Sequence, residues 1–296
     1  MDSKEPFVFQ IDSPDVLKAF DANNYFIEYD NSVDCDQDLC VIYFSSNEIY
    51  YPNTSNAFDY SIIKRNKYEW KRNKFPNAGK HIFIRDIRKQ WYIGGINTAL
   101  DTPLKMIDFL KTETHGYKVY TLGSSAGGYA AILFGSMLQA SRVYAFNAQL
   151  NLQVTMKTSG PLTDPILFER IENKEYNFYF NLSNFIASGD STDYYYFQSC
   201  RSQMDLDQYT AITENAKKKL KIVKFKTSNH GFPFLRINLP NILTFEKNDL
   251  EFFVNKTFHP ILFSVRLIGV FATFRFVLKA LIDRYKKKQL EASLKK

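Results

Sequence analysis

The stretch KVYTLGSSAGGYAAILFG, residues 118–135, decides how the rest of the chain is interpreted. An apolar run ends in two serines between glycines, and small residues with helix-forming character follow. Residues 123–127 fit the pattern G-x-S-x-G, in which a serine is held on a tight turn between a strand and a helix. The pattern predicts that Ser125, its middle residue, is a nucleophile, whereas Ser124 stands one position too early.

The neighbours of Ser125 suit this turn. Gly123 and Gly127 allow a close approach of strand and helix, because neither brings a Cβ into the crowded site. Ala126 would contribute a backbone N–H at the start of the helix, where the helix dipole favours a developing oxyanion. A second donor should come from the loop after an earlier strand, where VIYFSSN supplies Ser45 and Ser46. We predict Ser45.

A serine nucleophile needs a histidine base, and in this arrangement the chain order is serine, acid, histidine. His81 and His115 precede Ser125 and are excluded by that order. His230, in KIVKFKTSNHGFPF, follows a late apolar run on a loop and is therefore the predicted base. His259 precedes a proline at the start of the C-terminal segment, and we interpret it as structural.

The predicted acid lies in NFIASGDSTDYYYF, just past an apolar run that we interpret as a strand. We predict Asp193, because a residue a few positions past the strand glycine has room to curve toward the imidazole. Asp190 is the alternative. Either carboxylate could instead cap a local turn without any catalytic part.

Alternating short apolar runs and helix-like segments predict an α/β fold with a mostly parallel sheet covered by helices on both faces. Residues 102–116 and 126–140 have helical character, and residues 151–176 would form a lid or a long connection. The predicted strands are YFIEYD, LCVIYFSS, HIFIRDI, KVYTLG, RVYAFNAQ, FYFNLSNFIAS and LKIVKFKTS.

The charge of the chain is concentrated at one end. The formal net charge is +7, and residues 261–296 hold nine Lys/Arg against two Asp/Glu, so residues 1–260 are formally neutral. This distribution argues against a nucleic-acid-binding body and favours a local anionic partner, such as a membrane surface. Three cysteines without metal-ligand spacing predict no metal site and a reducing compartment. No signal peptide is recognisable, and we expect a cytoplasmic protein.

The C-terminal segment differs from the body and predicts a separate basic helix, residues 261–296, after a catalytic domain of residues 1–260. Arg266, Arg275 and Lys279 interrupt its apolar run, whereas a membrane span needs roughly 20 largely uncharged residues. We therefore expect an amphipathic helix on a membrane surface or on a partner, the alternative being a helix docked on its own sheet. The predicted apolar stripe is Phe263, Leu267, Val270, Phe274, Val277 and Leu281.

The motif YTLGSSAGGYAAILFGSML, with FIRDIRKQWYIGG before it and SNHGFPF after it, resembles α/β-hydrolase-fold proteins of bacterial capsule and surface-polysaccharide loci, including capsular polysaccharide O-acetyltransferases. The resemblance spans roughly residues 39–240. It implies an α/β-hydrolase fold, Ser125 as the residue that accepts the acyl group, and His230 as the base. Around residues 189–193 the match slips by one position, so the acid is not fixed by it.

The resemblance also implies a reaction, the transfer of an acetyl group from acetyl-CoA to a sugar hydroxyl through an acetyl-serine intermediate. The expected protein is thus an acyltransferase of polysaccharide synthesis, on the inner face of the membrane or with other capsule-assembly proteins. A carbohydrate or acyl esterase would use the same acyl-enzyme with water as the acceptor. A non-catalytic scaffold, joined to a membrane assembly by the basic helix, is the third interpretation.

Overall fold

The fold is built on one sheet with the strand order β1-β3-β2-β4-β5-β6-β7-β8. The computed structural model describes residues 11–293, with side chains as far as residue 286. Neighbouring strands run parallel except β1, which pairs antiparallel with β3. The strands are β1 (Tyr25–Tyr29), β2 (Asp36–Phe44), β3 (Ala78–Ile84), β4 (Lys118–Ser124), β5 (Arg142–Phe146), β6 (Asp193–Ser199), β7 (Leu220–Phe225) and β8 (Thr257–Phe258).

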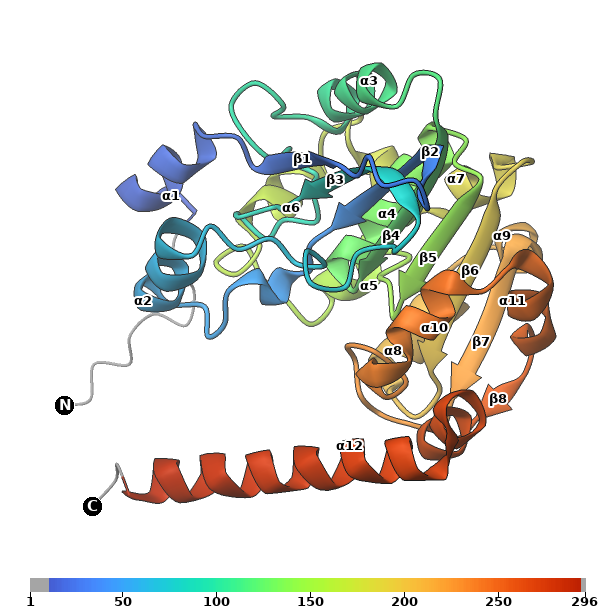
Figure 1. The fold of residues 1–296 in the computed structure, drawn as a ribbon. Helices are drawn as coiled ribbons and strands as arrows, with labels where there is room; N and C mark the ends of the chain where they lie inside the picture. The colour runs from blue at the N-terminus through green and yellow to red at the C-terminus, as the bar shows by residue number, and fades with distance from the viewer. Residues whose placement is uncertain (1–10, 294–296) are drawn as a thin grey trace.

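Helices lie on both faces of this sheet, as Figure 1 shows, and the predicted α/β-hydrolase fold is confirmed. The helical segments predicted at residues 102–116 and 126–140 form α3 and α4. The helices are α1 (Pro14–Phe20), α2 (Ser55–Phe58), α3 (Pro103–Glu113), α4 (Ala126–Met137), α5 (Leu152–Met156), α6 (Pro165–Arg170), α7 (Ser183–Ser188), α8 (Gln203–Thr210), α9 (Glu214–Lys219), α10 (Leu239–Thr244), α11 (Lys247–Phe253) and α12 (Pro260–Ser293).

The sheet separates two apolar cores, because successive side chains of a strand point to opposite faces. In β2, Ile42 and Phe44 pack with residues of α3, α4, α7 and α9. Val41 and Tyr43 face the other layer, formed by α10, α11 and the beginning of α12. Both faces of the central strands are therefore buried, as the near-continuous apolar runs of the sequence indicate.

One predicted strand is wrong. The run FYFNLSNFIAS forms a 3₁₀ turn, Asn177–Phe180, followed by helix α7. The side chain of Asn181 accepts hydrogen bonds from the N–H and the hydroxyl of Ser183, at 2.9 and 2.7 Å, and these favour a turn over an extended chain. The strand of this region is β6, which begins only at Asp193. Asp193 therefore opens a strand instead of following one.

The connection between β5 and β6 includes the segment 151–176, which was expected to be a lid or a long connection. It contains the short helices α5 and α6. Leu152 and Leu167 are fully buried in the same core as α4. This segment thus packs on the body of the protein.

Helix α12 begins against the body and then leaves it (Figure 1). Phe263 is 2% exposed and packs edge-on against Phe225. At Gly269 the backbone has φ 82° and ψ 168°, which breaks the helix into two parts. The predicted stripe from Phe263 to Leu281 is therefore wrong as one continuous face, because its first members lie before the break.

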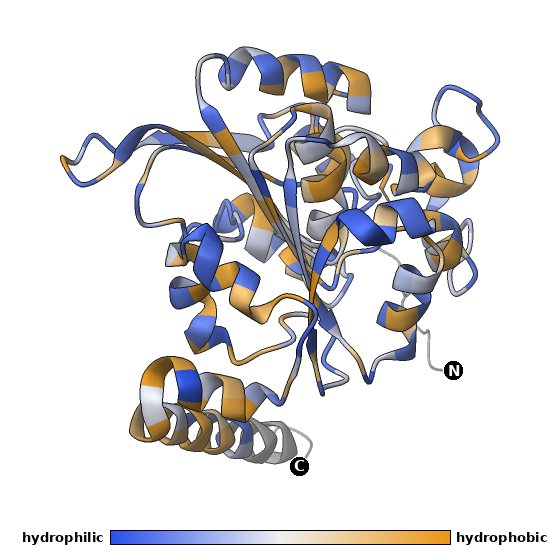
Figure 2. Cartoon of the chain, turned by 90° about the vertical axis from the view of Figure 1, so that its right-hand side faces the viewer, coloured by the Kyte–Doolittle hydropathy of each residue, from blue (hydrophilic) through white to orange (hydrophobic). Residues whose placement is uncertain are grey.

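Beyond Gly269 many residues of the helix are apolar, as the hydropathy colouring of Figure 2 shows. Most of their side chains are exposed. Phe271 and Phe274 are 93% and 66% exposed. Among the described residues, the segment Pro260–Lys286 is long and apolar enough to cross a membrane. Its most apolar stretch of 18 residues has a mean hydropathy of 2.0, and 17% of that stretch is buried. The basic end of the predicted helix also includes Lys287 and Lys288, whose side chains lie outside the described part of the structure.

Candidate active site

Ser125 lies alone between the end of β4 and the start of α4. Its backbone has φ 56° and ψ −121°, a strained conformation for a residue with a side chain. A Cβ on Gly123 would collide with the carbonyl of Gly127, and one on Gly127 would collide with the carbonyl of Phe44. The two glycines therefore permit the sharp turn that lifts Ser125 above the sheet.

His230 stands directly opposite this serine, on the loop that follows β7. Its Nε2 lies 2.9 Å from the Oγ of Ser125. The amide of Asn147, at the end of β5, holds the loop by donating to the carbonyl of His230 at 2.7 Å, and it reaches the neighbouring carbonyls of Asn229 and Gly231 at 3.0 Å. Asn147 is fully buried, so the position of the imidazole is fixed from beneath.

The carboxylate that contacts His230 is Asp205, a residue outside the predicted candidates Asp190 and Asp193. Its Oδ1 lies 2.8 Å from the Nδ1 of His230, and the residue is fully buried. A carboxylate accepts, so the Nδ1 carries the proton and the Nε2 is free to accept the hydroxyl hydrogen of Ser125. Asp205, His230 and Ser125 thus form a continuous hydrogen-bonded triad.

The predicted acid, Asp193, is not part of this arrangement. It opens β6 at the level of Arg142, at the amino end of the sheet, whereas His230 lies beyond the carboxyl ends. Its carboxylate pairs with Lys221 at 2.7 Å and with Lys247 at 2.9 Å. Burial alone would raise the pKa of Asp193, but the hydrogen bonds and charges of the two lysines outweigh it and lower the pKa.

The alternative acid, Asp190, is also away from the histidine. Its carboxylate is 91% exposed and pairs with Lys219 at 2.8 Å. The hydrogen bond and charge of this lysine lower the pKa of Asp190. Both aspartates thus pair with lysines at the amino end of the sheet. They lie there because the apolar run before them forms helix α7 and not the strand we predicted, so that Asp190 precedes β6 and Asp193 opens it.

The two predicted oxyanion donors, the N–H groups of Ala126 and Ser45, differ in their hydrogen-bond partners. Ala126 is the first residue of α4, where a backbone N–H has no partner within its own helix. The N–H of Ser45 instead donates to the carbonyl of Ile84 at 2.9 Å and is used by the sheet. The N–H of Ser46 donates to the carboxylate of Glu69 at 2.8 Å. The structure therefore does not support Ser45 as a donor.

Gln149 is a further polar residue beside Ser125. Its Nε2 lies 3.1 Å from the Oγ of Ser125, and its Oε1 accepts the indole N–H of Trp91 at 3.2 Å. Gln149 is 5% exposed. Gln149 ends the predicted strand RVYAFNAQ, whereas β5 stops at Phe146; a polar residue at the carboxyl end of an apolar run is the signal that could have found it.

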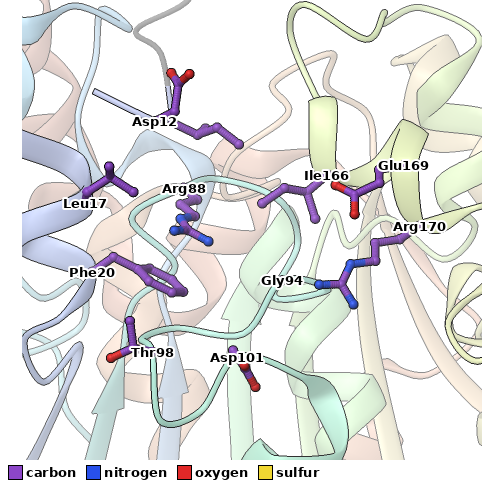
Figure 3. A pocket seen from close by; sticks show the side chains of 11 residues that line it. Asp12, Leu17, Phe20, Arg88, Gly94, Thr98, Asp101, Ile166, Glu169 and Arg170 are labelled. Atoms are coloured by element: carbon purple, nitrogen blue, oxygen red, sulfur yellow. The ribbon is translucent and has the colours of Figure 1, made fainter. Parts of the chain in front are cut away.

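A cavity of about 590 Å³ is lined in part by Ser124, Gly231 and Phe232, of which Ser124 and Gly231 are the chain neighbours of Ser125 and His230. A second hollow of about 400 Å³ lies elsewhere, among α1, α6 and the loop after β3 (Figure 3). Its lining includes none of the triad residues. Within the part of the chain that the structure describes, no cluster of His, Cys, Asp and Glu could hold a metal ion.

Comparisons with known proteins find structural similarity only. No family model and no curated protein matches the sequence. The capsule O-acetyltransferase of Neisseria meningitidis serogroup A is 16% identical with a TM-score of 0.49, over 69% of this chain and 83% of that one. A further structure of that enzyme is in complex with CoA.

Two hydrolases are also similar. An α/β hydrolase from the sediment metagenome of the Mar Chica lagoon is 15% identical with a TM-score of 0.42, over 76% of this chain and 95% of that one. Esterase B of Lactobacillus rhamnosis is 12% identical with a TM-score of 0.38, over 68% and 75%. Structural neighbours of this chain thus include an acetyltransferase and esterases.

Proposed function

We propose that this protein is a serine acyltransferase that O-acetylates a bacterial capsular or surface polysaccharide. The observation that carries the proposal is the unbroken chain of contacts from Asp205 through His230 to Ser125. A buried carboxylate, a tautomer fixed by it and a hydroxyl on a strained elbow are the parts that nucleophilic acyl transfer requires. Acetyl-CoA as the donor and a sugar hydroxyl as the acceptor follow from the sequence resemblance.

The first half of the reaction forms the acyl-enzyme. The Oγ of Ser125 attacks the carbonyl carbon of the thioester while the Nε2 of His230 takes the hydroxyl proton. Asp205 stabilises the imidazolium that results. The tetrahedral intermediate collapses, the carbon–sulfur bond breaks, and His230 returns the proton to the departing thiolate. The products of this half are free thiol and an ester on Ser125.

The second half repeats these steps with a new nucleophile. His230 takes a proton from a sugar hydroxyl, whose oxygen attacks the acyl carbon, and the proton then passes to the Oγ of Ser125. A water molecule in place of the sugar gives hydrolysis by the same route. The protein groups are the same in both cases, so the acceptor that reaches the acyl-serine separates a transferase from an esterase.

The test is incubation with acetyl-CoA, with and without a capsule-type oligosaccharide, using the Ser125→Ala protein as the blank. Thiol release that depends on the sugar supports the transferase. Release of acetate from an acetylated glycan without CoA supports the esterase. A non-catalytic scaffold is supported when neither substrate turns over and no acyl group is found on Ser125.

We also propose that the part of α12 beyond Gly269 contacts an anionic membrane surface from the cytoplasmic side. Phe271, Phe274 and Leu281 are exposed there, and Arg275 and Lys279 stand between them. An apolar helix with basic residues can bury its aromatic side chains at the lipid boundary while the cations meet anionic headgroups. Capsule-assembly proteins are the alternative partner.

The structure refines where the chain should be cut to test this proposal. A cut near Pro260 would remove Phe263 from the core, and it would also remove Ser264, which hydrogen-bonds Asn238 at 3.1 Å. A chain ending at Thr273 keeps both contacts. We expect that chain to stay folded and active on soluble substrate and to lose salt-sensitive sedimentation with anionic vesicles. Equal, salt-independent behaviour of the full and shortened chains would overturn the membrane proposal.

A further inference from the structure

The cavity beside the triad has an unusual lining. Most of its wall comes from residues 65–73, a loop between β2 and β3, and from Arg236 after the histidine loop. We call the cavity the basic pocket, because five of its lining side chains are cationic. They are Arg65, Lys67, Lys71, Arg72 and Arg236.

These charges are largely uncompensated. Arg65, Lys71, Arg72 and Arg236 form no ion pair with any side chain in the described part of the chain. Lys67 donates to the carbonyl of Ile49 at 2.8 Å, which leaves its charge unneutralised.

Two carboxylates also line the pocket, and one of them is already engaged. Glu69 accepts hydrogen bonds from the N–H and the hydroxyl of Ser46, at 2.8 and 3.2 Å. Burial raises the pKa of Glu69, and the opposing effects of the Ser46 hydrogen bonds and of the Lys67 charge are smaller. The other carboxylate, Glu48, is exposed. Positive charge therefore prevails in the pocket.

Aromatic rings lie under three of the free cations. The guanidinium of Arg65 lies 5.5 Å from the centre of the Tyr60 ring. The Nζ of Lys71 lies 4.4 Å from the centre of the Phe26 ring, and the guanidinium of Arg236 lies 5.6 Å from that of Phe232. Cation–π contacts of this kind hold a side chain in place without neutralising its charge. The cations are thus held in the lining of a cavity that also includes Ser124 and Gly231, the chain neighbours of Ser125 and His230, and they remain available to an anion.

We propose that the basic pocket binds the phosphate groups of a substrate of Ser125. Arginine and lysine are the side chains that proteins use for phosphate, and a cavity of about 590 Å³ lies in the size range of small-molecule sites. The proposal rests on the proposed function. The phosphates can belong to a nucleotide-type acyl donor such as CoA, or to an anionic acceptor glycan.

The test compares Arg72→Glu/Arg236→Glu with Lys111→Glu, an exposed charge reversal on α3 outside the pocket. We expect the double variant to raise the KM for acetyl-CoA at least about tenfold more than the KM for p-nitrophenyl acetate, an uncharged ester. Lys111→Glu should change neither. For an acyl donor without phosphates, the KM of the double variant should differ much less from the KM of the wild type.

The outcomes separate the two phosphate sources and the two proposals. A raised KM for a phosphate-bearing glycan, with that for acetyl-CoA unchanged, assigns the pocket to the acceptor. Equal increases in the KM for acetyl-CoA and the KM for p-nitrophenyl acetate would overturn the proposal that the pocket binds phosphate. Calorimetric titration of CoA and of inorganic pyrophosphate into the Ser125→Ala protein measures binding without turnover. The pocket can therefore be tested even where the acyl-transfer proposal fails.

A second inference rests on a different observation, the geometry of Gln149. Acyl transfer needs two donors for the oxyanion, and the N–H groups of Ser45 and Ser46 are already engaged. The amide of Gln149 is the side-chain donor at the nucleophile. Its Oε1 and Nε2 lie 3.3 and 3.1 Å from the Oγ of Ser125, so the orientation of the amide must be decided.

Trp91 decides the orientation. An indole N–H can only donate, so the atom of Gln149 at 3.2 Å from it is the oxygen, and the NH₂ group faces Ser125. The single hydroxyl hydrogen of Ser125 goes to His230 at 2.9 Å, which leaves its oxygen to accept from Gln149.

The loop that carries Trp91 is strained and held by one carboxylate. Trp91 and Tyr92 have φ of 52° and 62°, conformations that large side chains rarely adopt. The buried carboxylate of Asp86 accepts the backbone N–H groups of Arg88, Lys89, Gln90 and Tyr92 at 2.7–3.1 Å. All of them except Tyr92, which directly follows, lie in RDIRKQW, so this motif places the indole of Trp91 against Gln149.

We infer that the NH₂ group of Gln149, together with the N–H of Ala126, stabilises the oxyanion of the tetrahedral intermediate. This inference also rests on the proposed function. The test is Gln149→Leu, which keeps a similar volume and removes the donor. We expect kcat to fall about 10²–10³-fold with little change in KM, since the donor acts on charge that develops in the transition state.

A second measurement separates this role from simple support of the site. The affinity for a boronate, which forms a tetrahedral anion on a serine, should fall in Gln149→Leu by about the same factor as kcat/KM. Trp91→Phe, which keeps the ring and loses the N–H, should show a smaller fall of the same kind. Unchanged boronate affinity, or an effect confined to KM, would overturn the inference while Ser125 remained the nucleophile.

Discussion

The two ends of strand β6 each have an aspartate nearby, and the two residues differ in every respect that matters for chemistry. Asp193 opens the strand and pairs with two lysines. Asp205 lies six residues past the end of the strand, on α8, and contacts one imidazole. The first is partly accessible, with 21% of its side chain exposed, and the second is buried with 1% exposed.

This difference indicates that the edge of the sheet, more than the order of residues in the chain, determines which carboxylate contacts the imidazole. Both aspartates satisfy the order serine, acid, histidine. Parallel strands bring their carboxyl ends to one edge, where Ser125, Gln149 and His230 follow β4, β5 and β7. A carboxylate at the opposite edge is separated from them by the length of a strand, and its neighbours are cations that stabilise it as an ion pair.

The largest expected effect is the loss of either reacting side chain at the carboxyl edge. Ser125→Ala or His230→Ala should lower kcat by about 10⁶-fold, because each takes part in the bond changes themselves. Acyl transfer measured with excess substrate, beside circular dichroism and thermal melting, provides the check. Near-normal turnover of a folded Ser125→Ala protein would remove the basis of the elbow interpretation.

Substitutions of Asp205 and Asp193 test the comparison between the two ends of β6. Asp205→Asn should lower kcat by about 10⁴-fold, since an amide can hold the imidazole in the wrong tautomer and does not stabilise its charged form. Asp193→Asn, the matched control at the opposite end of β6, should stay within about twofold of wild type. If the two variants rank in the reverse order, the assignment of Asp205 is wrong.

A smaller effect is expected for the other serine of the elbow. Ser124→Ala removes a hydroxyl that lines the basic pocket and for which no hydrogen bond to His230 is observed. We expect kcat/KM to fall by less than about tenfold, far less than for Ser125→Ala. Mass spectrometry of the protein trapped with a slow acyl donor should find the acyl group on Ser125 in both wild type and Ser124→Ala.

The smallest effect concerns stability at the amino edge. Asp193→Asn should reduce the free energy of unfolding by about 1 kcal/mol or less at neutral pH, because partly exposed ion pairs are screened by water. The pKa of Asp193 is lowered in the folded state, so its contribution is present above the ordinary value of 3.8 and is lost as the pH falls below it. Urea unfolding at pH 7 and pH 3 should show a smaller difference between variant and wild type in acid.

The sequence predicted the fold and two members of the triad because their signals are local. The elbow needs two glycines around Ser125, and His230 follows an apolar run that is a strand. Asp205 has no such signal. It stands three residues after Ser202, whose hydroxyl accepts its N–H at 3.4 Å, and this pattern is also that of an ordinary helix cap.

The remaining errors come from competition between local and distant interactions. Residues 178–188 are rich in apolar side chains, and nothing in their composition distinguishes a buried helix from a buried strand. The partner of the Ser45 N–H is Ile84, 39 positions away. The role of Gln149 depends on Trp91, which comes from another loop, so this contact also requires the folded chain.

Asn147 links activity to the completeness of the fold. Its side chain bridges the end of β5 to the loop after β7, and its Oδ1 accepts the N–H of Ser199 at the end of β6. Three neighbouring strands must therefore be in register before His230 can reach Ser125. A chain that has collapsed without finishing its sheet has Ser125 but no imidazole beside it, so under the proposed function it cannot form an acyl-serine while it folds. Regain of turnover during refolding should accordingly be the last signal to return, after secondary structure and after burial of the aromatic core.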